Sequence, residues 1–148
     1  MYKRQDLDDG RINMIFYDLD YAMWNQTHNY FNFSVQPDGM SRLQVSTLMM
    51  RKLIVNDEFK ETFLNRLSYQ LKNVWHEERV LEKIDEIYES LKPEMERNQK
   101  KWGMTYQHWE DCVEELKEYT RLREKYIKSS AKSFFNLSDS EMEKYFGD

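Results

Sequence analysis

The sequence predicts a mainly α-helical fold, in which an N-terminal β-hairpin remnant is followed by five to six packed helices. Two observations support this. From about residue 45, apolar side chains recur at three- or four-residue steps almost to the C-terminus, which is the period of an amphipathic helix. Before that point, one short run from Ile12 to Trp24 is apolar and rich in β-forming residues. No repeat or linker divides the 148 residues, so a single domain is expected.

The composition is that of a globular, mildly acidic protein. With 33% charged residues and a net charge of −5, the chain has no overall basic character, and no nucleic-acid partner is expected. A single cysteine, Cys112, excludes an internal disulfide and a multi-cysteine metal site, and we expect it in the core; the three histidines show no metal-ligand spacing. No apolar run approaches the roughly 20 residues that a transmembrane helix needs. The N-terminus also lacks the apolar region of a signal peptide.

The first nine residues are predicted to be poorly ordered or artefactual. The opening letters MYKRQ carry no pattern and resemble translated adapter sequence at the ends of assembled metagenomic reads. Asp8-Asp9-Gly10 is a hairpin turn signal, but only its C-terminal side carries a good strand. We therefore expect that this strand has lost its partner, and that the chain is the C-terminal piece of a longer protein.

Residues 10–24 are predicted to form a strand that carries a pair of carboxylates, Asp18 and Asp20. Residues two apart on an extended chain point to the same face, so both carboxylates can reach one metal ion. Two neighbouring carboxylates repel each other unless a divalent cation or a donor network compensates them. The alternative is structural, because Asp residues after a strand are common turn formers and helix caps.

Residues 25–44 are predicted to be a loop, since turn residues are frequent and no periodicity is present. A long loop directly after a carboxylate-bearing strand suits a substrate-facing or regulatory role. Alternatively, its aromatic residues Tyr30, Phe31 and Phe33 pin the loop onto the core.

Residues 45–148 are predicted to be helical. Asn56 is placed to cap one helix, Gly103 to end another, and Ser138 with Glu141 spells a capping box. Pro93 either stops or bends the third helix, or opens the next one. The helices are expected at residues 46–55, 56–74, 77–91, 93–102, 106–129 and 138–146. Their apolar faces carry Phe59, Phe63, Leu67, Leu71, Val74, Val80, Leu81, Ile84, Ile87, Tyr88, Leu91, Trp109, Cys112, Val113, Leu116, Tyr119 and Tyr126.

Four segments together resemble one family. They are GRINMIFYDLD at residues 10–20, LIVNDEFKETFLNRL at residues 53–67, KPEMER at residues 92–97 with KWG at residues 101–103, and Trp109 followed by EELKEY and Arg123. In this order and spacing they resemble the spore-coat CotH-type protein kinases, an atypical branch of the protein-kinase-like fold. The resemblance implies that the helical region is similar to the C-terminal lobe of a kinase and forms the floor behind the active site.

The resemblance also implies site residues and cofactors. Asp18 occupies the position of the magnesium-binding Asp, and Asp20 would support the same ion directly or through water. Mg²⁺ or Mn²⁺ with ATP would be the cofactors of the full-length parent, and its partner would be a protein substrate that receives the phosphate. The sequence departs from the family at Tyr17, where Trp is common, and at residues 21–24, where a Phe-Gly pair often follows.

Other implied parts have no counterpart in the 148 residues. The nucleotide-binding lobe with its Lys, and the loop that supplies the catalytic base, are expected upstream, so the fragment alone is predicted to be inactive. The resemblance also implies that the parent is exported or associated with a spore coat or cell envelope, as members of the family often are.

Two alternatives remain open at this point. Haloacid-dehalogenase-type phosphohydrolases also open with a strand that ends in Asp-X-Asp. They have a Thr or Val two places after the second Asp and alternate strands with helices downstream, whereas this chain has Ala22 and Met23 and then helices. The other alternative is a non-catalytic helical interaction module in which the Asp pair is structural.

Overall fold

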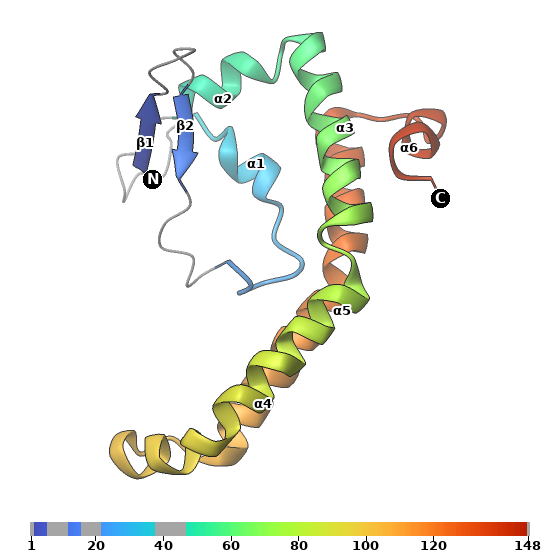
Figure 1. Cartoon of the computed structure of the whole chain (residues 1–148). Coiled ribbons are helices and arrows are strands. Elements are labelled where there is room, and N and C mark those ends of the chain that lie inside the picture. Colours follow the sequence, from blue (N-terminus) through green and yellow to red (C-terminus); the bar gives the residue numbers. More distant parts are fainter. Residues whose placement is uncertain (1, 6–11, 16–21, 38–46, 148) are drawn as a thin grey trace.

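The computed structural model describes residues 2–5, 12–15, 22–37 and 47–147. This part of the chain is mainly helical, as predicted, with six helices and two short strands. Figure 1 shows a long α4–α5 pair that extends away from the remaining elements, with α3 beside the C-terminal half of α5. The elements are β1 (Tyr2–Gln5), β2 (Ile12–Ile15), α1 (Tyr30–Ser34), α2 (Leu48–Leu53), α3 (Asp57–Asn73), α4 (Glu77–Trp102), α5 (Tyr106–Phe135) and α6 (Asp139–Phe146).

The two strands pair with each other. β1 runs antiparallel to β2, with Tyr2 opposite Ile15 and Gln5 opposite Ile12. The expectation that the strand at residue 12 has no partner is therefore wrong, because main-chain pairing needs no apolar pattern in the second strand. Of the predicted strand over residues 10–24, Ile12–Ile15 is a strand, whereas residues 22–24 form a turn and a bend, so the strand does not extend to Trp24 as predicted. The turn signal at residues 8–10 and both carboxylates of the Asp pair lie outside the described residues.

The expected loop at residues 25–44 contains a helix of five residues, α1. The side chain of Asn29 caps it by accepting a hydrogen bond from the backbone N–H of Asn32 at 3.1 Å. So short a helix has no full apolar period to reveal it in the sequence. Phe31 on this helix stacks with Phe134 of α5, with ring centroids 5.7 Å apart, so at this residue the loop is pinned to the core.

The third and fourth predicted helices are one continuous helix, α4, which runs through Pro93 to Trp102. The expected break at Pro93 is wrong. Proline removes one N–H, which leaves the carbonyl of Glu89 without its helical partner. Residues 89 and 93 both lie on the exposed side of the helix, where water can hydrogen-bond to that carbonyl. The helix ends at Gly103, whose φ of 75° is the left-handed conformation of a C-cap.

Capping residues mark three other helix boundaries: the start of α3, the start of α6 and the end of α5. Asn56 caps α3 as predicted, since its side chain accepts from the N–H of Phe59 at 2.9 Å. The capping box at Ser138 and Glu141 is also confirmed at the start of α6. α5 continues beyond the predicted end at Ser129 and stops before Asn136, which has a φ of 51°.

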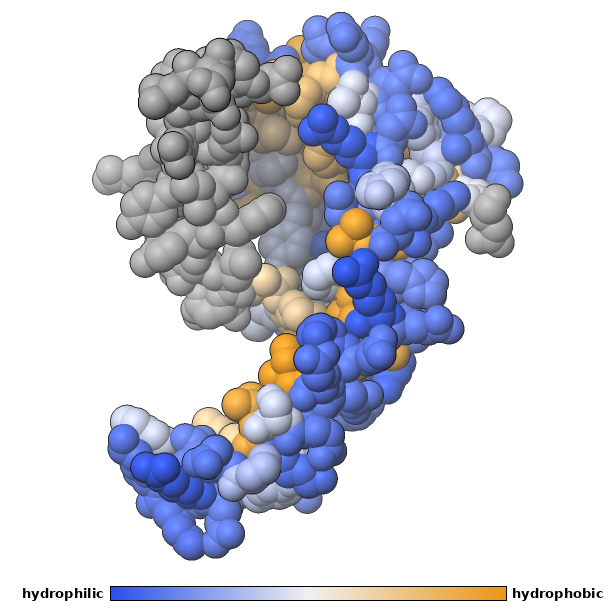
Figure 2. Space-filling view, viewed as in Figure 1, coloured by the Kyte–Doolittle hydropathy of each residue, from blue (hydrophilic) through white to orange (hydrophobic). Residues whose placement is uncertain are grey.

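The core lies where α3, the C-terminal half of α5 and α6 meet. The apolar face predicted for residues 77–91 does not enter this core, because α4 has no buried residue and Ile87 and Leu91 are 50% and 47% exposed. Among the described elements α4 packs mainly against α5, so part of its apolar stripe remains on the surface, and Figure 2 shows apolar residues along this α4–α5 arm. The buried cluster consists of Leu64, Leu71, Ala131, Phe135, Leu137, Tyr145 and Phe146.

Candidate functional site

The segment Ala22–His28 is the part of the described chain that lies closest in sequence to the predicted carboxylate pair. Asp18 and Asp20 themselves lie outside the described residues, so the site is built from the residues that follow them. Ala22 follows Asp20 by two residues, and two peptide units span at most about 7 Å. A contact at Ala22 therefore lies within two residues of the pair, whereas contacts at Gln26 and His28 lie six and eight residues after Asp20.

Arg123 of α5 connects the segment to the helix. One of its terminal guanidinium nitrogens donates to the carbonyl oxygens of Gln26 at 2.6 Å and His28 at 3.1 Å. The guanidinium also lies over the Tyr30 ring, 5.1 Å from its centroid, a cation–π distance. Arg123 is only 7% exposed, so these contacts form in a desolvated position.

Tyr119 makes a second link from α5. Its hydroxyl donates to the carbonyl oxygen of Ala22 at 3.4 Å, and its side chain is buried. Burial raises the pKa of the Tyr119 hydroxyl, and the positive charge of Arg123 offsets only part of this rise. The hydroxyl is therefore protonated and able to donate at neutral pH. Residues 119 and 123 are four apart and therefore lie on the same face of the helix.

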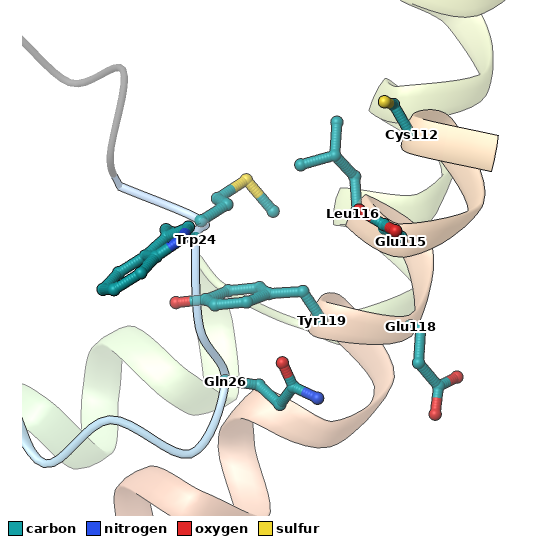
Figure 3. A pocket seen from close by; sticks show the side chains of 8 residues that line it. Trp24, Gln26, Cys112, Glu115, Leu116, Glu118 and Tyr119 are labelled. Atoms are coloured by element: carbon teal, nitrogen blue, oxygen red, sulfur yellow. The ribbon is translucent and has the colours of Figure 1, made fainter. Parts of the chain in front are cut away.

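A cavity of about 530 Å³ lies between the segment and α5. Figure 3 shows the Tyr119 ring reaching from α5 toward the segment that carries Trp24 and Gln26, while the carboxylate of Glu118 points away from Trp24. The cavity combines apolar and aromatic walls with acidic and amide groups, as a ligand site does. It is lined by Met23, Trp24, Gln26, Cys112, Glu115, Leu116, Glu118 and Tyr119.

Two residues of the predicted core stripe on α5 differ from expectation. Cys112, expected in the core, is only half-buried and lines this cavity, with its Sγ 3.8 Å from Nε2 of His108. Leu116, expected on a core-facing stripe, is 36% exposed. In both cases the α5 face points toward the cavity, which the period of the sequence could not reveal.

Arg123 lies in one of the four segments that resemble the family, but no role was predicted for it from the sequence. The available signal was a charged side chain in the apolar stripe of an amphipathic helix, four residues after Tyr119. Its backbone partners are 97 and 95 residues away in the chain, which no local pattern predicts.

Among the described residues there is no group of three or more His, Cys, Asp or Glu side chains that could hold a metal ion. No helix in the same part of the chain is long and apolar enough to cross a membrane.

A family model described as CotH kinase protein matches residues 1–127. The chain belongs to this family. The matched range contains the two strands, the Asp pair, the segment Ala22–His28 and the part of α5 that carries Tyr119 and Arg123. All four segments that carried the resemblance to CotH-type kinases also fall within it.

Comparisons with curated proteins and with solved structures found no match to the chain. The assignment to the CotH family therefore depends on the family model, and the comparisons favour neither of the two alternatives considered from the sequence.

Proposed function

We propose that this chain carries the metal-binding corner of a CotH-type kinase, formed by Asp18 and Asp20. The family match over residues 1–127 supports the proposal, because it includes the strand and both carboxylates. Carboxylate oxygens are the ligands that Mg²⁺ and Mn²⁺ prefer in proteins, so the chemistry of this donor pair fits the ion. In the full-length parent an ion held by these carboxylates would offset the charge of the nucleotide phosphates during transfer from ATP to a protein.

The proposal assigns metal binding and backbone positioning to different residues. Asp18 binds the ion, and Asp20 binds it directly or through water. The segment Ala22–His28 follows the pair in the chain and lies against α5, where Tyr119 and Arg123 bind its backbone carbonyls. Phosphate transfer also needs a nucleotide-binding Lys and a catalytic base. We assign neither within the 148 residues, so the chain alone is expected to be inactive.

Metal binding by the 148-residue chain tests the first part of the proposal. Mn²⁺ binding would be measured by electron paramagnetic resonance and calorimetry, with Mg²⁺ as competitor. Asp18→Asn should abolish the site, and Asp20→Asn should weaken it. Asp111→Asn is the matched control, because this exposed Asp on α5 bonds only to Gln107 among the described residues. Equal Mn²⁺ affinity in the wild type and Asp18→Asn would remove Asp18 from the site.

Catalysis is tested in the full-length parent. ATP-dependent phosphate transfer to protein should require Mg²⁺ or Mn²⁺ and should be lost in the Asp18→Ala variant. Retained transfer in that variant would show that Asp18 has no part in the mechanism, even if it binds metal in the shorter chain.

A further inference from the structure

Arg123 has an unusual environment for a buried cation. Burying a guanidinium is costly unless its charge and donors are compensated. In the part of the chain that the structure describes, no carboxylate forms an ion pair with Arg123. The compensation comes instead from two backbone carbonyls of the segment Ala22–His28 and from the rings of Tyr30 and Tyr119, whose centroids lie 5.1 and 5.8 Å from the guanidinium.

These contacts all fix one short piece of chain. The carbonyls of Gln26 and His28 are bound by one guanidinium nitrogen, and the carbonyl of Ala22 is bound by Tyr119. The segment thus has three backbone attachments to a single face of α5. A lysine at position 123 could keep the positive charge, but it lacks the planar guanidinium, which holds the two N–H groups of this nitrogen in fixed directions and presents a flat surface that packs over an aromatic ring.

We propose that Arg123 is a positioning residue, which together with Tyr119 holds the chain that follows the carboxylate pair so that the pair can bind its metal ion. This inference rests on the proposed function of Asp18 and Asp20. Groups that hold metal ligands in place without touching the ion typically change metal affinity by about 10- to 100-fold when they are altered. Arg123 acts through the backbone of Ala22–His28, and it needs no contact with the metal or the nucleotide.

The test compares two arginines on the same helix. Arg123→Lys removes the planar guanidinium at the buried position and keeps the charge. Arg121→Lys is the control, because Arg121 is more exposed and pairs with Glu114 at 2.8 Å. Tyr119→Phe is a second, milder variant that removes only the hydroxyl bonded to Ala22. Mn²⁺ affinity and backbone hydrogen exchange over residues 22–30 and 57–73 would be measured for each protein.

We expect Arg123→Lys to speed exchange over residues 22–30, to leave residues 57–73 protected, and to weaken Mn²⁺ binding by about tenfold or more. Tyr119→Phe should shift both readouts in the same direction by less, and Arg121→Lys should change neither. Unchanged exchange over residues 22–30 in Arg123→Lys would overturn the positioning role, as would faster exchange with unaltered Mn²⁺ affinity.

The two proposals fail in different ways. A wild-type chain that binds no Mn²⁺ would overturn the metal-binding corner and the role of Arg123 with it. A wild type and an Arg123→Lys variant that bind Mn²⁺ equally well would overturn only the role of Arg123, provided that Asp18→Asn abolishes binding.

Discussion

The ring of Tyr88 in α4 stacks on the ring of Trp109 in α5, with centroids 4.7 Å apart and planes 10° from parallel. The Tyr88 hydroxyl donates to the carboxylate of Glu110 at 3.1 Å, and the Tyr106 ring packs edge-on against Trp109. Farther along the pair, Lys117 bridges to Asp85 at 2.5 Å. Because α4 has no buried residue and packs mainly on α5, contacts of this kind hold the α4–α5 arm together.

Trp109→Ala should therefore loosen the arm and leave the core intact. An aromatic pair contributes about 0.5–1.5 kcal/mol beyond the area it buries, and the whole side chain contributes more. Hydrogen exchange should become faster along α4 and remain slow in α3. Trp102→Ala is the matched control, because Trp102 is 70% exposed at the end of α4. Equal exchange in the two variants would show that the Tyr88–Trp109 stack does not stabilise the arm.

Pro93→Ala is expected to stabilise the arm. Proline in a helix interior is about 3 kcal/mol less favourable than alanine, and α4 continues through this residue without ending. Alanine restores the N–H that can bond to the carbonyl of Glu89. Thermal unfolding followed by circular dichroism should show a higher midpoint for the variant. A lower midpoint would mean that the proline ring itself makes a stabilising contact.

The helix ends show which features the sequence could predict. Asn56, Gly103 and Ser138 each act within three or four residues of their own position, so the boundaries of α3, α4 and α6 follow from local chemistry. Pro93 also acts locally, but its effect depends on whether water reaches the freed carbonyl, which is a property of the folded surface.

Burial and the candidate site depend on distant contacts and could be predicted only in part. The period of residues 77–91 correctly marks an apolar stripe on α4, but no pattern in the sequence shows that mainly α5 would cover it and leave Ile87 and Leu91 half-exposed. In the same way, Tyr119 and Arg123 could be placed on one helix face, while their partners in Ala22–His28 follow from the tertiary fold. The carboxylate pair lies within the range of the family match, and its metal-binding role stays a prediction.

The capping box of α6 gives a prediction with a defined pH dependence. The Ser138 side chain accepts from the N–H of Glu141 at 3.2 Å, and the Glu141 carboxylate accepts from the N–H of Ser138 at 2.8 Å. The hydrogen bond from the Ser138 backbone holds the pKa of Glu141 below its usual range. α6 supplies Tyr145 and Phe146 to the core, so loss of the capping hydrogen bonds at its first turn should lower the stability of the whole fold.

Ser138→Ala should lower the free energy of unfolding by about 1 kcal/mol at neutral pH, the usual effect of losing an N-cap side chain. Ser133→Ala, at an exposed position within α5, is the control and should have almost no effect.

A carboxyl whose pKa is lower in the folded state stabilises the fold above its unfolded pKa of about 4.3, and the benefit is lost as the pH falls through the folded pKa. Urea unfolding at pH 7 and at successively lower pH should therefore show a smaller acid-dependent loss of stability in Glu141→Gln than in the wild type. An identical acid dependence in the two proteins would contradict this role of the Glu141 carboxylate.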